Sequence, residues 1–196
     1  MLDAVGRMVL GGDVTALRQR LKTTPSLARF TFEAELLVTE NPHQLYTGDT
    51  LLHLAAAAVQ PAVARALVDA GADVKARNRR RAQPLHYACD PRPAHRDAWT
   101  PDAQEELIRL LIAAGADPNA ADASGATPLH RAVRARSAHA VRALLAEGAD
   151  PNVRAGRNGS TPLHLALTSS GASGTAGSGE ARADIVAQLV AAGGPT

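Results

Sequence analysis

Apolar residues recur three and four positions apart in several segments of the chain, and this spacing predicts amphipathic helices. The apolar stripes are Val63 and Leu67; Leu107, Ile108 and Leu111; Val141, Leu144 and Leu145; and Ile185, Val186 and Leu189. Gly71, Gly115 and Gly148 follow the first three stripes, and glycine tolerates the left-handed conformation that ends many helices. Residues 30–36, FTFEAEL, instead alternate apolar and polar positions, which is the period of a half-buried strand. The pattern therefore predicts a series of short helices interrupted by one extended segment.

A short motif precedes each apolar stripe. The segments TLLHLAA, QPLHYAC, TPLHRAV and TPLHLAL begin at residues 50, 83, 127 and 161, and they place histidines at 53, 86, 130 and 164. A threonine hydroxyl can cap the N-terminus of a helix, and proline fits the first helical position because its missing N–H would have no partner there. Downstream, GADVKA, GADPNA and GADPNV begin at residues 71, 115 and 148, and a degraded GGPT begins at 193. Each copy thus predicts two helices followed by a glycine stop and a turn.

These motifs together resemble the ankyrin repeat family. The resemblance implies an all-α solenoid of about five helix-turn-helix units, with finger loops that project from the stacked helix pairs. We place the units at about residues 1–29, 46–76, 79–120, 123–153 and 157–196, within a single domain that spans 1–196. The first unit matches more loosely, and we expect Asp13 to cap its second helix.

Three insertions break the even spacing. The distance from the repeat histidine to the closing glycine is 18 residues in units two and four but 29 in units three and five, so each longer unit carries 11 extra residues. We place these insertions at 90–100, where Thr100 starts the next helix, and at 169–180, which is rich in glycine and serine and expected to be flexible. The third insertion, 30–45, predicts an enlarged finger that can form a short β-hairpin.

Composition agrees with helix packed on helix. Hydrophobic residues make up 45% of the chain but aromatic residues only 3%, so the apolar content is mostly Ala, Leu and Val. The single cysteine, Cys89, excludes an intramolecular disulfide, and neither a membrane span nor a signal peptide is recognisable, so we expect a cytoplasmic protein that does not bind membranes. Lysine occurs only at 22 and 75 while arginine is abundant, a bias typical of GC-rich bacterial genomes.

The candidate metal and cofactor sites favour structural interpretations. Because the four repeat histidines are one repeat apart, they do not converge on a metal ion. The resemblance implies instead that they tie neighbouring finger bases together. His86, Cys89 and His95 form one local metal-like set, but Cys89 stands where the family places a buried alanine. GTAGSG from Gly174 is a weak match to a phosphate-binding loop. We therefore expect no metal, no cofactor and no small-molecule ligand.

Arginines are concentrated near the fingers, above all in KARNRRRAQ from Lys75. The resemblance implies that finger tips and the exposed ends of the first helices line a concave groove. The partner-binding candidates at those positions are Tyr46, Asp49, Arg79, Arg80, Arg134, Arg157 and Asn158. A basic stripe there favours an acidic partner by charge complementarity. The alternative, a solvated arginine surface that keeps the protein soluble, remains open.

These features predict a non-enzymatic protein–protein interaction scaffold that binds a protein or peptide through its groove and fingers. One alternative is a regulatory or antitoxin-like subunit of an enzyme. Another is an enzyme that uses the loop from His95 to Trp99, although no catalytic residues can be assigned from spacing. Nucleic acid is disfavoured because the aromatic side chains that stack on bases are nearly absent.

Overall fold

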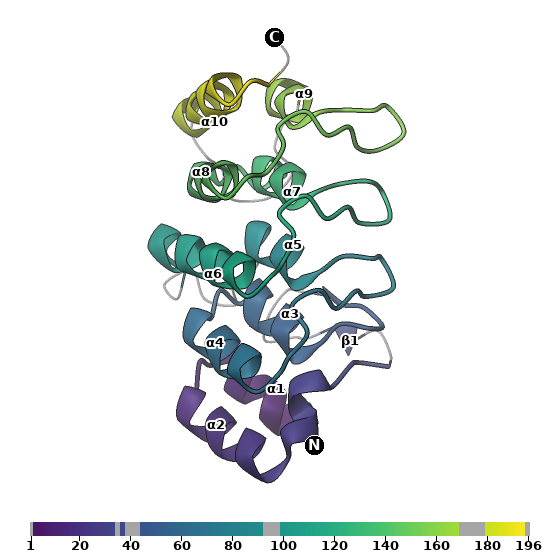
Figure 1. Cartoon of the computed structure of the whole chain (residues 1–196), viewed down its shortest axis with the longest axis vertical. Coiled ribbons are helices and arrows are strands. Elements are labelled where there is room, and N and C mark those ends of the chain that lie inside the picture. Colours follow the sequence, from purple (N-terminus) through teal and green to yellow (C-terminus); the bar gives the residue numbers. More distant parts are fainter. Residues whose placement is uncertain (1, 34–35, 38–43, 92–98, 169–178, 195–196) are drawn as a thin grey trace.

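The computed structural model describes residues 2–33, 36–37, 44–91, 99–168 and 179–194. Within this part of the chain, five helix pairs stack along the long axis of the molecule (Figure 1). The pairs are α1 (Leu2–Leu10) and α2 (Val14–Thr23), α3 (Leu51–Ala57) and α4 (Pro61–Asp69), α5 (Pro84–Cys89) and α6 (Pro101–Ala113), α7 (Pro128–Arg134) and α8 (Ala138–Ala146), and α9 (Pro162–Thr168) and α10 (Gly179–Ala191). A short 3-10 helix, η1 (Pro25–Arg29), follows α2. This arrangement confirms the predicted all-α repeat solenoid.

The helices form two rows. The first helices of the pairs contact one another in the order α1, α3, α5, α7 and α9, and the second helices do so in the order α2, α4, α6, α8 and α10. Figure 1 shows the second helices on the left, the first helices beside them, and the finger loops projecting to the right. The fingers and the first helices therefore share one side of the molecule, and the second helices form the other.

One hydrophobic core runs through the stack. The leucine that precedes the repeat histidine, at positions 52, 85, 129 and 163, is at most 5% exposed in every copy. Burying a leucine side chain stabilises a fold by roughly 1.5–3 kcal/mol. Because this leucine lies among helices of its own and neighbouring units, the units are stable only as an array.

The helix ends follow the sequence rules. The carboxylate of Asp13 accepts a hydrogen bond from the N–H of Ala16 at 2.9 Å, and the hydroxyl of Thr100 accepts one from Ala103 at 3.1 Å. Both caps confirm the predicted helix starts. At the other ends, Gly71, Gly115 and Gly148 have φ angles of 89°, 103° and 86°, the left-handed conformation expected there.

The segment between η1 and α3 contains the predicted short hairpin, but its first strand begins at Leu36, and residues 30–33 of the predicted strand form only an isolated bridge, from Thr31 to Thr50. Strands β1 (Leu36–Leu37) and β2 (Gln44–Leu45) pair antiparallel, with Leu36 opposite Leu45. The N–H of Phe32 also donates to the carbonyl of Asp49 at 2.8 Å, which ties the extended segment to residues 46–49, the tip of the first finger. Val38, which we expected to continue the strand, and the centres of the other two insertions lie outside the described residues.

No helix in the described part of the chain is both long and apolar enough to cross a membrane.

Candidate partner-binding surface

Backbone hydrogen bonds join the tips of neighbouring fingers. The N–H groups of Arg79, Ala123 and Gly156 donate to the carbonyls of Thr47, Arg80 and Ser124, respectively, and each N···O distance is 2.8 Å. The tips therefore form a continuous edge beside the first helices, on the right of Figure 1. Because each tip is fixed to the next, side chains on this edge need little ordering when a partner binds.

A ladder of buried histidines holds the bases of the fingers. In each case Nδ1 accepts a backbone N–H at the start of its own helix, and Nε2 donates to a carbonyl of the following finger. The ladder bonds run from His53 to Ala82 (3.1 Å), His86 to Ala126 (3.2 Å) and His130 to Ser160 (3.1 Å). Burial lowers the pKa of all three histidines, that of His86 to about 4, so the rings are neutral at pH 7. These contacts confirm, for His53, His86 and His130, the finger-tying role implied by the family resemblance; the ring of His164 contacts Thr161 of its own unit.

Two members of the local metal-like set, His86 and Cys89, have structural roles. Both ring nitrogens of His86 already have backbone partners, the N–H of Gln83 and the carbonyl of Ala126. Cys89 is fully buried in the core, and burial raises the pKa of its thiol, which agrees with the prediction of a small core residue. His95 lies outside the described residues. Among those described, no three His, Cys, Asp or Glu side chains are grouped as a metal site requires.

Asn78 organises the tip of the second finger, which we define as residues 75–82. Its side-chain oxygen accepts the N–H groups of Arg80 at 2.9 Å and Ala82 at 3.0 Å. Its Nδ2 donates to Asp49 Oδ1 at 2.8 Å and to the Tyr87 hydroxyl at 2.9 Å. Since both amide protons and both lone pairs are used, Asn78 locks this finger to the preceding finger and to α5.

Asp49 is completely buried beneath the first two fingers. Its Oδ2 accepts hydrogen bonds from the N–H of Tyr46 at 2.8 Å and from the hydroxyl of Tyr87 at 2.9 Å. Burial, and next the charge of Asp49, raise the pKa of Tyr87 far above its usual range, so the phenol keeps its proton. This location corrects the expectation that Asp49 contacts a partner, because the carboxylate has no exposed surface and instead positions the fingers around it.

Arg80 crosses from the second finger to the first. Its guanidinium lies 5.1 Å from the centre of the Tyr46 ring and donates to the Tyr46 hydroxyl at 2.8 Å. A cation over an aromatic ring is attracted to the negative face of that ring. Arg80 is nevertheless exposed, as is Arg79 beside it, and Tyr46 is half-buried. Three of the predicted partner-binding residues are therefore adjacent on the surface.

The third finger, residues 119–126, is built around Asp122 instead of an asparagine. Its Oδ1 accepts the N–H groups of Ser124 at 2.8 Å and Ala126 at 3.1 Å, and its Oδ2 pairs with Arg131 at 2.6 Å. Burial acts to raise the pKa of Asp122, but the hydrogen bonds from Ser124 and Arg131 outweigh it and lower the pKa to about 2. Asp122 is therefore ionised at pH 7 and neutralised by Arg131.

A second carboxylate neutralises the arginines of α7. Asp90, at the end of α5, pairs with Arg134 and lies 3.8 Å from Arg131. Both arginines project from α7, while the two acids Asp90 and Asp122 come from the preceding unit and finger. The predicted basic stripe is thus interrupted here, because Arg134 lies in a charge-balanced cluster.

The tip of the fourth finger carries the last two predicted residues. Arg157 and Asn158 are both exposed, between the paired residues Ala155 and Ser160. They lie at the same edge as Arg79 and Arg80 but two fingers away. The candidates at the finger tips thus form two groups, separated by the third finger.

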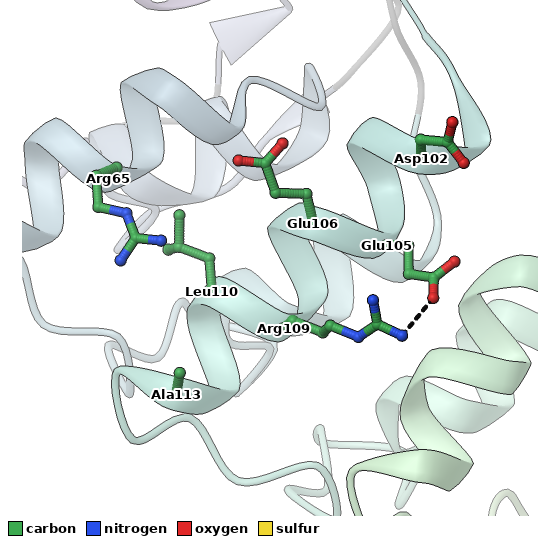
Figure 2. Close-up of a pocket in the computed structure, with 7 residues that line it drawn as sticks. All are labelled: Arg65, Asp102, Glu105, Glu106, Arg109, Leu110 and Ala113. Carbon is green, nitrogen blue, oxygen red and sulfur yellow. Dashed lines mark hydrogen bonds and ion pairs between the residues drawn. The ribbon is translucent and has the colours of Figure 1, made fainter.

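A depression lies on the other side of the molecule, between α4 and α6 (Figure 2). Its lining is Arg65, Asp102, Glu105, Glu106, Arg109, Leu110 and Ala113. Glu105 is paired with Arg109 at 2.5 Å and with Arg142 of α8 at 3.1 Å. The lining contains no histidine, cysteine or serine, and its charged side chains have both signs. We interpret it as a charged surface between two outer helices.

The candidate enzyme loop is described only at its end. Trp99 is partly buried and packs against the hydrophobic core, which favours a structural role for this end of the insertion. His95 and Asp97 lie outside the described residues.

Sequence reasoning missed several residues that shape the surface. Asn78 and Asp122 each lie eight positions before a repeat histidine, and Tyr87 and Arg131 each lie one position after it. Aligning the fingers on their histidines would have revealed both pairs, since Asn occurs with Tyr in one unit and Asp with Arg in the next. Asp90 had no such signal, because its partners lie 41 and 44 residues away in the chain.

The stacked helix pairs and the hydrogen-bonded finger edge define a helical repeat scaffold. In family comparisons, residues 94–193 match a model of three ankyrin repeats and residues 47–79 match a single ankyrin repeat. The chain belongs to the ankyrin repeat family. Ankyrin repeats generally mediate protein–protein interactions, and the family is generally non-enzymatic. A comparison with curated proteins found no match.

Proposed function

We propose that this protein is a non-enzymatic scaffold that binds a protein or peptide partner along its finger edge and first helices. The contact residues are Tyr46, Arg79, Arg80, Arg134, Arg157 and Asn158. Asp49 is left out because it is buried; it positions Tyr46 from below. We also propose a reducing, cytoplasmic setting of bacterial type, which suits a chain with a single buried thiol.

The observation that carries this proposal is the hydrogen-bonded edge of fingers with exposed side chains on it. Three tip-to-tip backbone bonds and three histidine bonds fix the fingers relative to one another. A surface that is rigid before binding loses little conformational entropy on association. The outer helices, by contrast, present paired charges such as Glu105 with Arg109 and Arg142.

Site-specific photo-crosslinking tests which side binds. A photoreactive phenylalanine derivative replaces Arg79 or Asn158 on the finger edge, and Arg18 or Arg65 on the outer helices, one position at a time. All four side chains are exposed, so each variant is expected to fold. Crosslinked partners are identified by mass spectrometry, and their binding is then measured with purified proteins.

We expect crosslinks to one partner from Arg79 and Asn158 and none from Arg18 or Arg65. Equal crosslinking from the outer helices would overturn the proposal. Chemical turnover of a purified partner or metabolite by the isolated protein would contradict its non-enzymatic part.

A further inference from the structure

We infer that the second finger is the docking point for an acidic segment of the protein partner. This inference rests on the proposed function and deepens it by naming the chemistry of the partner. Residues 75–81 carry five cations and no acid: Lys75, Arg77, Arg79, Arg80 and Arg81. All five side chains are exposed. Seven residues of one loop thus concentrate positive charge in a chain whose net charge is only +2.

Three of these five cations differ from the arginines of α7 in their ion pairing. Within the described residues, no ion pair involves Lys75, Arg77 or Arg81, whereas Arg131 and Arg134 are both neutralised by aspartates. The nearest buried acid, Asp49, is occupied by Asn78, Tyr46 and Tyr87. The positive field of the second finger therefore extends into solvent, where it attracts a negatively charged partner.

Arg81 adds an independent observation. Its φ angle is 57°, in the left-handed region that disfavours every residue with a side chain except Asn and Asp. The equivalent positions in the other fingers are Gly48, Gly125 and Gly159, all with positive φ. The second finger thus carries a strained arginine where its neighbours carry glycine. Val59 and Arg136 have similar φ angles, so the left-handed conformation alone does not set Arg81 apart; its distinction is a cation at a position that is glycine in the other fingers.

The finger is also rigid. Asn78 closes the tip with four hydrogen bonds, and the backbone of Arg79 and Arg80 is bonded to the fingers on both sides. The Arg80 guanidinium is held over Tyr46 and still has donors available for a carboxylate. An acidic segment would therefore meet guanidinium groups on a fixed backbone, which reduces the entropy lost on binding.

An acidic protein segment fits this surface better than a nucleic acid. Single-stranded nucleic acids are bound by aromatic side chains that stack on the bases. Of the two tyrosines that contact the second finger, Tyr87 is buried, and the ring of Tyr46 already lies under the guanidinium of Arg80. Carboxylates, which pair with arginine forks without stacking, match the groups that are present.

The test uses fluorescein-labelled octaglutamate as the probe and fluorescence anisotropy as the measurement, with the full chain. We expect saturable binding that weakens as the salt concentration rises, because these charges are exposed. The double variant Arg80→Glu/Arg81→Glu is expected to weaken binding by at least about tenfold. The matched control Arg18→Glu/Arg20→Glu makes the same charge change on exposed residues of α2 and is expected to change binding by less than about twofold.

Arg81→Gly separates binding from folding. It removes one cation but also the unfavourable φ, so the probe should bind about two- to threefold more weakly while the melting temperature rises. Octaglutamine and a labelled oligothymidine are the comparison probes. The inference is overturned if wild type does not bind octaglutamate, if both double variants lose binding equally, or if oligothymidine binds more tightly than octaglutamate.

Different results would refute the acidic docking point and the finger-edge binding surface. If the crosslinked partner still binds Arg80→Glu/Arg81→Glu with unchanged affinity, the acidic docking point is refuted while the finger-edge scaffold stands. If crosslinks arise only from the outer helices, the scaffold surface itself is refuted, whatever octaglutamate does.

Discussion

The second and third fingers have the same backbone hydrogen bonds, but the side chain that accepts them is neutral in one finger and charged in the other. In each, a side chain eight residues before the repeat histidine accepts the N–H groups two and four residues further on. In the second finger that side chain is the neutral Asn78, set between Asp49 and Tyr87; in the third it is the charged Asp122, paired with Arg131. The turn therefore requires only an acceptor, and the residue one position after the histidine decides whether the acceptor can be charged.

Exchanging the two acceptors should produce the largest effect. In the wild type, the Asn78 amide donates a hydrogen bond to the fully buried carboxylate of Asp49 at 2.8 Å. Asn78→Asp replaces this donor with a second carboxylate next to Asp49. We expect the free energy of unfolding at pH 7 to fall by about 4 kcal/mol, because a buried charge is left without a partner. The comparison variant Asp122→Asn keeps an acceptor in the third finger and is expected to lose about 1–2 kcal/mol. Urea denaturation followed by circular dichroism measures both.

Adding Tyr87→Arg to Asn78→Asp reproduces the third-finger arrangement and should restore at least about half of the lost stability. If Asn78→Asp instead unfolds at the same urea concentration as wild type, the proposed coupling between Asn78 and Asp49 is incorrect.

The second largest effect should be a loss of stability in acid, where His86 at the base of the third finger becomes protonated. The pKa of His86 is lowered from 6.5 to about 4 by burial, and then by the charge of Arg131, so the unfolded chain binds a proton more readily than the folded one. The stability that depends on neutral His86 is complete above about pH 6.5 and is lost as the pH falls from 6.5 to 4. The shift corresponds to about 3 kcal/mol. The pKa of Asp122 is lowered to about 2, so the stability that its ionised carboxylate contributes is lost only at lower pH, as the pH falls from about 4 to 2.

Urea denaturation at a series of pH values between 7.5 and 4 measures this dependence. His86→Gln offers the same two hydrogen-bonding functions without a titrating group, so its stability should fall less steeply over that range. A slope equal to that of wild type would show that His86 is not the group responsible.

Local rules in the sequence were sufficient for most of the fold. The Thr-Pro-Leu-His motif determined the helix starts and the histidine ladder, and Asp13 and Thr100 cap their helices as predicted. Each of these features depends on residues within one or two turns, or on a contact that recurs at the repeat spacing.

The candidate surface was less predictable because its contacts cross units. Asp49 was predicted from the family resemblance to line the groove, but it is buried by contacts with Asn78 and Tyr87, which are 29 and 38 residues away. The ion pair between Arg134 and Asp90 was not predicted, because it forms across an insertion that alters the repeat spacing. Pairing between units requires the three-dimensional register of the stack, which the periodicity of one chain does not contain.

The glycines at the tips of the first and third fingers, Gly48 and Gly125, differ in how closely the neighbouring finger approaches them. Gly48 and Gly125 have φ angles of 88° and 79°, but a Cβ on Gly48 would lie 3.0 Å from Asn78 Cα, whereas the nearest atom to a Cβ on Gly125 is 3.6 Å away. We expect Gly48→Ala to destabilise the fold by about 2 kcal/mol and Gly125→Ala by about 1 kcal/mol. Thermal unfolding compares the two variants, and an equal loss would show that contact with the second finger does not limit position 48.

The smallest effect distinguishes the backbone of the second finger from its charge. Arg81→Gly relieves a φ of 57°, which outweighs the greater freedom of glycine in the unfolded chain, so stability should rise by about 0.5 kcal/mol. Arg77→Gly is the matched control: it removes the same charge from the same finger, at a residue whose φ is not positive. That variant should lose stability by a similar amount, as glycine does where the native backbone suits any residue. If both variants become more stable in thermal unfolding, repulsion among the finger cations, rather than the conformation of Arg81, is the source of the strain.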